Sequence, residues 1–331
     1  MAQKLKMSDI AKMAGVSKTT VSRYFNGGYV KEETREKLRE IIEKYNYEPN
    51  SLAAGLKAKQ THIVGIVCAC LDSYTSSRMM MSIDDRLHHS HHYTTVILNT
   101  NHDELRELTA LEQLWRMNVD GIILMATHIT MAHHKIASKL DIPMIFVAQS
   151  YEDGISVIND DYNAGYQMGT YVANCNHRDV VYMGVEQKDV AVGIVRKSGV
   201  YNGLEDHGVS HIKFVESDFS AEKARRRIAR ILDQHMPTCI ICATDTMALA
   251  CYRELVSRGL KVPDDVSLAG FGGYWVSETM EPALTTIRFK YDEVGRIAAD
   301  EMIHLIAHEQ VEKAMLVGYE FIKGESVKVM S

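Results

Sequence analysis

Apolar residues between positions 6 and 47 recur every three or four residues, which is the spacing of short amphipathic helices. The apolar face consists of Ile10, Ala11, Ala14, Val16, Val21 and Phe25. The alternation of apolar and polar residues that marks a strand is missing from this stretch. The pattern therefore predicts three short helices over residues 6–47.

The helical pattern stops near Tyr47, because Pro49 disfavours the helical conformation at Glu48. Asn50 is a good N-cap for one further short helix over residues 51–57. The pattern changes after Gln60. We therefore predict an all-α head over residues 1–60.

From His62 onward, short apolar runs of the β type alternate with helical stretches. The predicted strands are Ile63–Ala69, Thr94–Leu98, Gly121–Met125, Met144–Val147, Val180–Gly184, Lys213–Val215, Cys239–Cys242 and Val266–Ala269. The predicted helices include Ser77–His88, Glu104–Asn118, Tyr162–Asn174, Ala221–Gln234 and Thr246–Arg258.

This alternation is typical of parallel sheets that are covered by helices on both faces. The strands are too many for one small sheet, and two similar lobes fit them better. We therefore predict an α/β body over residues 61–331 with two doubly wound parallel-sheet lobes. The lobes cover roughly 61–160 and 161–290, and the chain crosses back after residue 290.

The composition, with 46% hydrophobic and 24% charged residues, is typical of a soluble globular protein. The 331 residues are too many for one ordinary domain. No apolar run reaches the length of about 18 residues that a membrane span needs. The first residues, MAQKLKMSDIAKMAG, lack the apolar core of a secretion signal. These features predict a cytoplasmic protein.

The formal net charge of −6 conceals an uneven distribution. Residues 1–60 hold 12 Lys and Arg against 7 Asp and Glu, whereas the remainder holds 25 against 36. A basic head on an acidic body suits a head that binds phosphate groups.

Five of the six cysteines lie in apolar runs that resemble buried strands and an apolar helix face. Cys239 and Cys242 have the spacing of a redox or zinc pair, but no second C-x-x-C occurs. On a strand, residues i and i+3 also point to opposite faces. We therefore interpret these cysteines as inert core thiols.

Residues 7–25, MSDIAKMAGVSKTTVSRYF, have the features of a helix-turn-helix. Gly15 can adopt the left-handed conformation that ends the first helix, and Ser17 can cap the second. The second helix would expose short hydroxyls and cations, which suit phosphate and base-edge contacts. These exposed positions are Lys18, Thr19, Thr20, Ser22 and Arg23. An ordinary surface helix is the alternative, but the combined features favour DNA binding.

Residues 7–60 resemble the headpiece of LacI/GalR-family repressors. The resemblance rests on D-I-A-x-x-A-G-V-S-x-x-T-V-S-R at Asp9–Arg23, on Asn26, and on Y-x-P-N at Tyr47–Asn50. It continues through residues 52–57 into the body, which implies a fold like that of periplasmic binding proteins. By position, Lys18, Thr19 and Arg23 match base-reading residues. The matches to phosphate-contacting or positioning residues are Ser17, Thr20, Ser22, Asn26, Tyr47 and Asn50.

Residues 51–57 resemble the family's hinge helix. The resemblance implies that Leu56 enters the minor groove and unstacks a central base step, with Lys57 beside it. Packing on a helix face is the alternative role of Leu56. Because an isolated helix this short is marginal in water, we expect it to order only on the operator.

Open parallel sheets bind ligands at the carboxyl ends of their strands. Hydroxyls, amides, carboxylates, aromatic rings and one arginine gather there and suit a sugar. The predicted effector residues are Asp72, Ser73, Asn101, Gln149, Asp161, Gly193, Arg196, Thr244, Asp245, Phe271, Gly272 and Tyr274. Arg196 can bind a carboxylate or phosphate through two parallel hydrogen bonds, and a surface salt bridge is its alternative role.

The family usually carries an Asp in the position of Gly272, and that Asp contacts the effector. Its absence here implies that the ligand is held differently, and it removes repulsion toward an anionic ligand. The body most resembles repressors of sucrose or trehalose uptake. This resemblance implies an inducer of the sucrose type, with trehalose 6-phosphate as the next candidate.

Motifs of catalysis do not accompany this cleft. The sequence contains no G-x-S-x-G, H-E-x-x-H or G-x-x-x-x-G-K-[ST]. His88, His89, His91 and His92 point in different directions on a helix, and no nearby group completes a metal site. We therefore expect neither an enzyme nor a cofactor, and we favour a solvated helix end over adventitious metal binding.

The resemblance implies a homodimeric repressor whose two heads bind the half-sites of a palindromic operator. We expect helix Ser77–His88 to contribute the subunit interface. An activator or a corepressor-dependent regulator would carry the same motifs. A sugar-binding or sugar-processing protein that never contacts DNA is the other alternative, but it leaves residues 7–57 unexplained.

Overall fold

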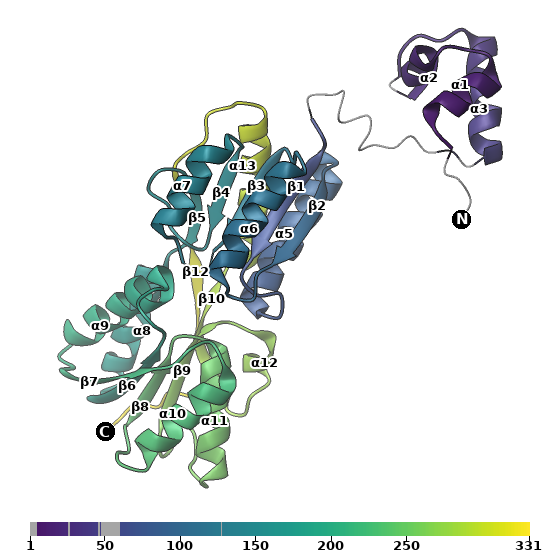
Figure 1. The fold of residues 1–331 in the computed structure, drawn as a ribbon. Coiled ribbons are helices and arrows are strands. Elements are labelled where there is room, and N and C mark those ends of the chain that lie inside the picture. The colour runs from purple at the N-terminus through teal and green to yellow at the C-terminus, as the bar shows by residue number, and fades with distance from the viewer. Residues whose placement is uncertain (1–4, 26, 46, 48–59, 127) are drawn as a thin grey trace. The chain divides into compact units, whose positions relative to one another are not determined.

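The computed structural model describes residues 5–25, 27–45, 47, 60–126 and 128–331 (Figure 1). The chain divides into two compact units, Met1–His62 and Ile63–Ser331, and each is described by itself. None of the helices in these described residues is long and apolar enough to cross a membrane.

The head contains the three predicted helices, α1 (Met7–Ala14), α2 (Lys18–Phe25) and α3 (Glu32–Tyr45). Their small core confirms the predicted apolar face and adds residues from α3. The core residues are Ile10, Ala11, Ala14, Val21, Leu38 and Tyr47, with Val16 and Phe25 packed against them. The predicted hinge helix over 51–57 lies outside the described residues.

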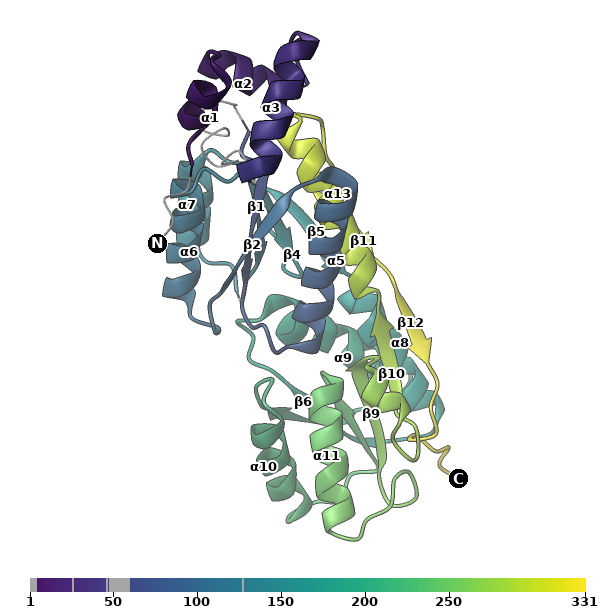
Figure 2. The same ribbon diagram turned by 90° about the vertical axis from the view of Figure 1, so that its right-hand side faces the viewer.

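The first lobe of the body is a six-stranded sheet in which all the pairs are parallel. Its order is β11-β5-β4-β3-β1-β2. Helices α5 and α13 pack together on one face, and α6 and α7 cover the other (Figure 2). The strands are β1 (Ile63–Cys68), β2 (Thr94–Asn99), β3 (Gly121–Met125), β4 (Met144–Val147), β5 (Ile155–Asn159) and β11 (Ala314–Val317). The helices are α5 (Tyr74–His91), α6 (Glu104–Arg116), α7 (Met131–Leu140) and α13 (Tyr291–Ile306).

The second lobe repeats this plan with the order β12-β10-β9-β8-β6-β7. Helices α8 and α9 pair on one side of the sheet, and α10 and α11 pair on the other (Figure 1). The strands are β6 (Asp179–Gly184), β7 (His211–Glu216), β8 (Cys239–Cys242), β9 (Ser267–Gly272), β10 (Thr285–Phe289) and β12 (Tyr319–Ile322). The helices are α8 (Asp161–Asn174), the π-helix η1 (Val190–Arg196), α9 (Lys197–Glu205), α10 (Ala221–Leu232), α11 (Asp245–Ser257) and the short α12 (Trp275–Glu278).

The chain passes between the lobes after β5, after β10 and between β11 and β12. Because β10 ends where the chain leaves for the first lobe and β12 begins where it returns, these two neighbours run antiparallel. The prediction of parallel sheets therefore holds for the other strands, and β12 is the exception.

The eight predicted strands are all present, with ends shifted by up to three residues. The sequence patterns missed β5, β10, β11 and β12. Strands β11 and β12 have four residues each and lie at sheet edges, so they carry little apolar signal. In β10, Thr285, Thr286 and Arg288 interrupt the apolar run.

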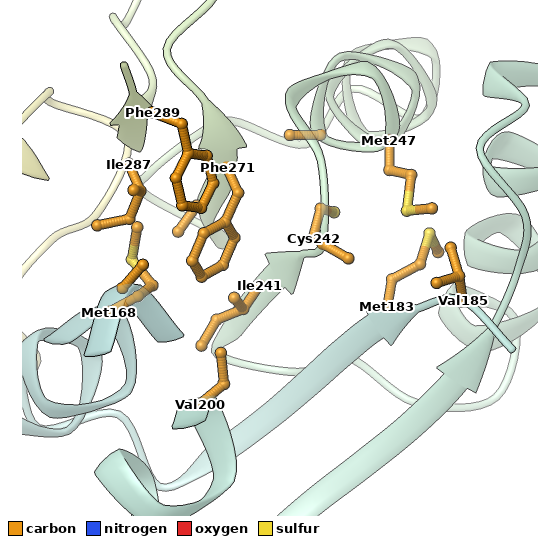
Figure 3. Packing of buried hydrophobic residues seen from close by; sticks show 14 of the residues in the cluster. Met168, Met183, Val185, Val200, Ile241, Cys242, Met247, Phe271, Ile287 and Phe289 are labelled. Carbon is orange, nitrogen blue, oxygen red and sulfur yellow. The ribbon is translucent and has the colours of Figure 1, made fainter. Parts of the chain in front are cut away.

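The core of the second lobe lies between its sheet and the helices (Figure 3). The rings of Phe271 in β9 and Phe289 in β10 lie side by side there, with their centroids 6.5 Å apart. Ile241 and Val200 approach the same rings, while Met183 and Met247 fill the neighbouring space (Figure 3). This packing places the carboxyl ends of β8, β9 and β10 next to one another.

Candidate functional site

The turn between α1 and α2 is built by two local features. Gly15 ends α1 with a φ of 69°, in the left-handed region that favours glycine. The Ser17 hydroxyl accepts a hydrogen bond from the amide of Thr20 at 3.2 Å, as an N-cap does. Both predicted roles are confirmed, and together they set the direction in which α2 leaves the turn.

Helix α2 packs against the head through Val21 and presents its opposite side to solvent. The side chains of Lys18, Thr19 and Arg23 are exposed there, and none of them forms an ion pair within the described part of the chain. Ser22 is half-buried on the same side. The cations of Lys18 and Arg23 therefore remain available for an external partner.

The remaining predicted DNA contacts differ in their placement. Thr20 is half-buried, and its hydroxyl lies 2.9 Å from that of Ser17. Tyr47 is buried against Phe25, with the ring centroids 5.9 Å apart, which is the position of a supporting residue. Four predicted residues lie outside the described part of the chain, namely Asn26, Asn50, Leu56 and Lys57.

In the body, the predicted effector residues follow the carboxyl ends of strands in both lobes. Asp72 and Ser73 lie between β1 and α5, where the Ser73 hydroxyl accepts from the amide of Ser76 and caps α5. Asn101 follows β2 and is exposed, with a φ of 54°. Most of the others are buried.

Gln149 connects the two lobes. It follows β4 of the first lobe, and its Nε2 donates to Oδ1 of Asp189 in the second lobe at 3.1 Å. Its Oε1 accepts from the amide of Ala191 in η1 at 3.4 Å. Asp189 also caps η1 by accepting from the amide of Val192. The side chain of Gln149 is therefore occupied by the opposite lobe.

Gly193 is required by its backbone environment. A Cβ atom at this position would lie 2.1 Å from the carbonyl oxygen of Glu186, so only glycine fits. It lies in a π-helix, a rare form that is frequent at functional sites. This close approach holds η1 against the loop that follows β6.

Arg196 is not a surface salt bridge, because it is only 6% exposed. Its Nε and Nη2 donate to Oδ1 of Asp161 at 2.8 and 2.6 Å, and its Nη1 donates to the carbonyl of Ala243 at 2.6 Å. The guanidinium also lies 5.2 Å from the ring centroid of Phe271 and 4.7 Å from that of Phe289. The alternative of a surface salt bridge was therefore wrong, and the arginine already holds a carboxylate.

Phe271 belongs to this buried arrangement. It is nearly inaccessible, and its ring points into the core of the second lobe toward Phe289 and Ile241 (Figure 3). In this conformation it supports Arg196 from within the lobe and does not form a cleft surface. Burial of Asp161 raises the pKa of that carboxyl, and Arg196 opposes the shift.

Asp245, at the start of α11, is completely buried. Its Oδ2 accepts from the amide of Tyr274 at 3.0 Å and from the hydroxyl of Ser277 at 2.9 Å, while its Oδ1 accepts from Thr286 at 2.6 Å. Burial raises its pKa, and these hydrogen bonds oppose the shift. Asp245 therefore positions the segment after β9, and the preceding Thr244 caps α11.

An open hollow of about 650 Å³ lies beside this group, and residues of both lobes line it. Of the predicted effector residues, only Gly272 is part of its lining. Tyr74 and Tyr291, which the sequence analysis did not single out, line it as well. Tyr74 directly follows the predicted Ser73, and this adjacency was the one signal for it. Asp189 was also missed, although it lies four residues before Gly193.

The histidines and cysteines form no further site in the described residues. His91 binds Asp300 of α13 with its Nε2 at 3.0 Å, and no group of three metal-ligating side chains occurs in this part of the chain. All six cysteines are free, and five are buried. Burial raises the pKa of Cys68 to about 11, which disfavours its reactive thiolate form.

Comparisons with known proteins agree with this arrangement. Residues 6–50 match the bacterial regulatory proteins of the lacI family, and residues 170–327 match a periplasmic binding protein-like domain. The sucrose operon repressor of Staphylococcus xylosus is 34% identical over 319 residues, which cover 95% of this chain and 98% of that protein.

Two solved structures show the same fold. The lac repressor dimer bound to operator and the anti-inducer ONPF has a TM-score of 0.90 at 24% identity, covering 98% of this chain and 100% of that one. The transcriptional regulator CelR in complex with cellobiose has a TM-score of 0.74 at 22% identity, covering 97% and 99%. The chain belongs to the lacI family, and it is a DNA-binding transcriptional repressor rather than an enzyme.

Proposed function

We propose that this repressor controls a sugar-utilisation operon and leaves its operator when a sugar binds the body, with sucrose as the first candidate. The likeness to the sucrose operon repressor carries this proposal, because it extends over nearly the whole of both chains. Trehalose 6-phosphate is the second candidate. The repressor acts in the cytoplasm, where its operator DNA lies.

The base-reading residues in this proposal are Lys18, Thr19 and Arg23. Their exposed side chains lie on one side of α2 and have no ion pairs inside the described head. Two cations and a hydroxyl suit the base-edge acceptors of guanine in the major groove and the phosphate oxygens of the DNA backbone. The positioning contacts are Ser17, Thr20, Ser22, Asn26, Tyr47 and Asn50, and Leu56 with Lys57 contacts the minor groove.

The operator is palindromic and the protein is a homodimer, because a single short helix reads too few bases for specificity. Exposed apolar side chains on the first lobe support this part of the proposal. Met81 on α5 is 63% exposed, and Ile97 on the edge strand β2 is also exposed. Met79 and Met80 are buried, so Met81 is the member of this methionine run that a partner subunit would cover.

A neutral sugar fits the second lobe better than a phosphorylated one. The donors of Arg196 that a phosphate would need are already bound to Asp161. Asp189 and Asp245 also lie nearby, and additional acidic side chains do not favour the binding of an anion. Ser73, Asn101, Gln149 and Thr244 carry hydroxyl and amide groups that suit the hydroxyls of a disaccharide. In the described conformation Ser73 and Thr244 cap helices and Gln149 binds Asp189, so a sugar would have to exchange with these internal contacts.

Induction then exchanges contacts within the protein for contacts with the ligand. Gln149 binds Asp189 and Ala191 of the opposite lobe in the described conformation, so a sugar that takes over Gln149 changes how the lobes meet. The lobes move, the subunits shift, and the hinge helices lose their place on DNA. By linkage, operator binding weakens sugar binding by the same factor.

A gel shift with the DNA upstream of the chain's own operon tests the proposal. The protein is expected to retard this DNA, and sucrose is expected to release it. Trehalose, both 6-phosphates and fructose are added in parallel lanes. If trehalose 6-phosphate alone releases the DNA, the effector is the phosphorylated sugar and not the neutral one. Tighter binding with a sugar would make it a corepressor, and retention of DNA under every sugar would overturn the proposed effector class.

A further inference from the structure

Two consecutive glycines, Gly272 and Gly273, lie at the carboxyl end of β9. Gly272 has a φ of 146° and Gly273 a φ of 63°, both in the region that favours glycine. A Cβ atom on Gly272 would lie only 2.3 Å from Cε1 of the Tyr274 ring and 2.8 Å from two further ring atoms. The Tyr274 ring therefore fills the space that any side chain at position 272 would need.

The same ring connects the two lobes. Its centroid lies 4.3 Å from that of Tyr74, with an angle of 39° between the planes. Tyr74 begins α5 of the first lobe, whereas Tyr274 follows β9 of the second. Their contact spans 200 residues of sequence and lies next to the hollow that Tyr74 and Gly272 line.

Tyr274 is held firmly on the side of its own lobe. Its amide donates to the buried Asp245, and its side chain is only 6% exposed. Burial raises the pKa of its phenol well above the ordinary value. A mobile surface tyrosine would have neither the amide contact to a buried carboxyl nor such a low exposure, so the ring has a defined place between the lobes.

We propose that Tyr274 is a built-in occupant of the effector cleft, which a pyranose ring must displace from Tyr74 in order to bind. This inference rests on the proposed function and adds a requirement to it. The effector must offer an apolar ring face that can replace the Tyr274 ring on Tyr74. Polar hydroxyls alone do not compensate for the lost aromatic contact.

The burial of the predicted effector residues supports this occupancy. Gln149, Arg196 and Thr244 are each less than a tenth exposed, so a ligand reaches them only after an internal contact has opened. The Tyr74–Tyr274 pair is such a contact, because it joins the two lobes through the faces of two aromatic rings. An aromatic pair adds stability beyond its buried area, so opening this one costs free energy.

Removing the Tyr274 ring should therefore strengthen ligand binding. In Tyr274→Ala the cleft is no longer self-occupied, and the apparent affinity rises because a larger fraction of the protein is competent to bind. Calorimetry of sucrose with the full-length chain is expected to show binding roughly two- to tenfold tighter than in the wild type. Phe219→Ala removes a part-exposed aromatic ring elsewhere in the same lobe and serves as the control, with no expected change.

A second measurement needs no ligand. In Tyr274→Ala, hydrogen exchange is expected to accelerate at residues 73–77 and 189–192, where the lobes meet, and to stay unchanged in Phe219→Ala. Tyr274→Leu, which is shorter than the tyrosine ring but keeps apolar volume, replaces the alanine variant if thermal melting shows that the latter does not fold.

The outcomes separate the two proposals. Unchanged or weaker sucrose binding by Tyr274→Ala would overturn the occupant role, since weaker binding would make Tyr274 a direct ligand contact. If neither protein binds any of the tested sugars, the proposed effector class fails. In that case hydrogen exchange alone tests the occupant role of Tyr274. Unchanged exchange rates at residues 73–77 and 189–192 in Tyr274→Ala would overturn it.

Discussion

The functional side chains of the head and of the body differ in their exposure and in their internal contacts. In α2, Lys18, Thr19 and Arg23 are exposed and have no internal ion pairs in the described head. In the body, Asp161, Arg196 and Asp245 are buried and bound to other parts of the protein. The head presents a surface that is ready for DNA, whereas the body must give up internal contacts before a ligand can bind.

This difference has a physical reason. DNA is large and highly charged, and exposed cations on α2 can bind it without giving up contacts inside the protein. A sensor must respond to a small molecule by changing shape, and a ligand shifts an equilibrium only through contacts that differ between two states. Buried internal contacts that a ligand can replace supply this difference.

The strongest test of the comparison is Asp161→Ala, which leaves Arg196 buried without its carboxylate. We expect a loss of about 3–5 kcal/mol in the free energy of unfolding of the body, measured by chemical denaturation. Asp161→Asn keeps an acceptor and should lose less. A loss below about 1 kcal/mol in the alanine variant would show that this pair is not buried as described.

Arg23→Ala probes the exposed side of the comparison. We expect operator affinity to fall by about 1–3 kcal/mol in gel shifts, with weaker discrimination among half-site sequences. The melting temperature should not change, because the side chain has no partner within the described head. Arg39→Ala in α3, whose cation already pairs with Glu36, is the matched control and should bind DNA nearly as the wild type does.

Glu254→Gln tests whether buried charge in the body matters away from the cleft. Hydrogen bonds from Arg258 and Arg225 hold the pKa of Glu254 below its ordinary value. A carboxyl with a lowered pKa stabilises the protein above its unfolded pKa, about 4.3, and this contribution disappears as the pH falls through the lower folded value.

The glutamine variant should therefore lose about 1–2 kcal/mol at pH 7, a range reduced because both arginines are partly exposed. It should approach the wild type in acid denaturation experiments below about pH 4. Sugar-induced release of the operator should stay unchanged. An equal loss at both pH values would contradict the ionic role of Glu254.

The smallest effect is expected from Ser17→Ala in the head. Loss of the N-cap should lower the stability of α2 by about 1 kcal/mol or less, seen as a lower melting temperature of the head. Ser17→Asp keeps a capping acceptor and should retain the stability. Its added charge would weaken DNA binding, which separates the two roles of this residue.

Much of the head was predictable from its sequence because its determinants are local. The turn at Gly15, the cap at Ser17 and the apolar spacing of Ile10, Ala14 and Val21 lie within 12 residues. The eight strands with strong apolar runs were predictable for the same reason. The short edge strands β11 and β12 were not, because they form only where the chain passes between the lobes.

The sequence by itself determined which side chains the protein can use, namely a polar face on α2 and polar groups after the strands of both lobes. Only the tertiary structure decided their partners. Asp161 meets Arg196 across 35 residues, and Tyr74 meets Tyr274 across 200. Such contacts depend on how two sheets and their crossing strands pack, and this packing leaves no periodic signal along the chain. The sequence thus predicted Tyr274 as part of the cleft, and the structure shows that its ring fills the place of a side chain at Gly272.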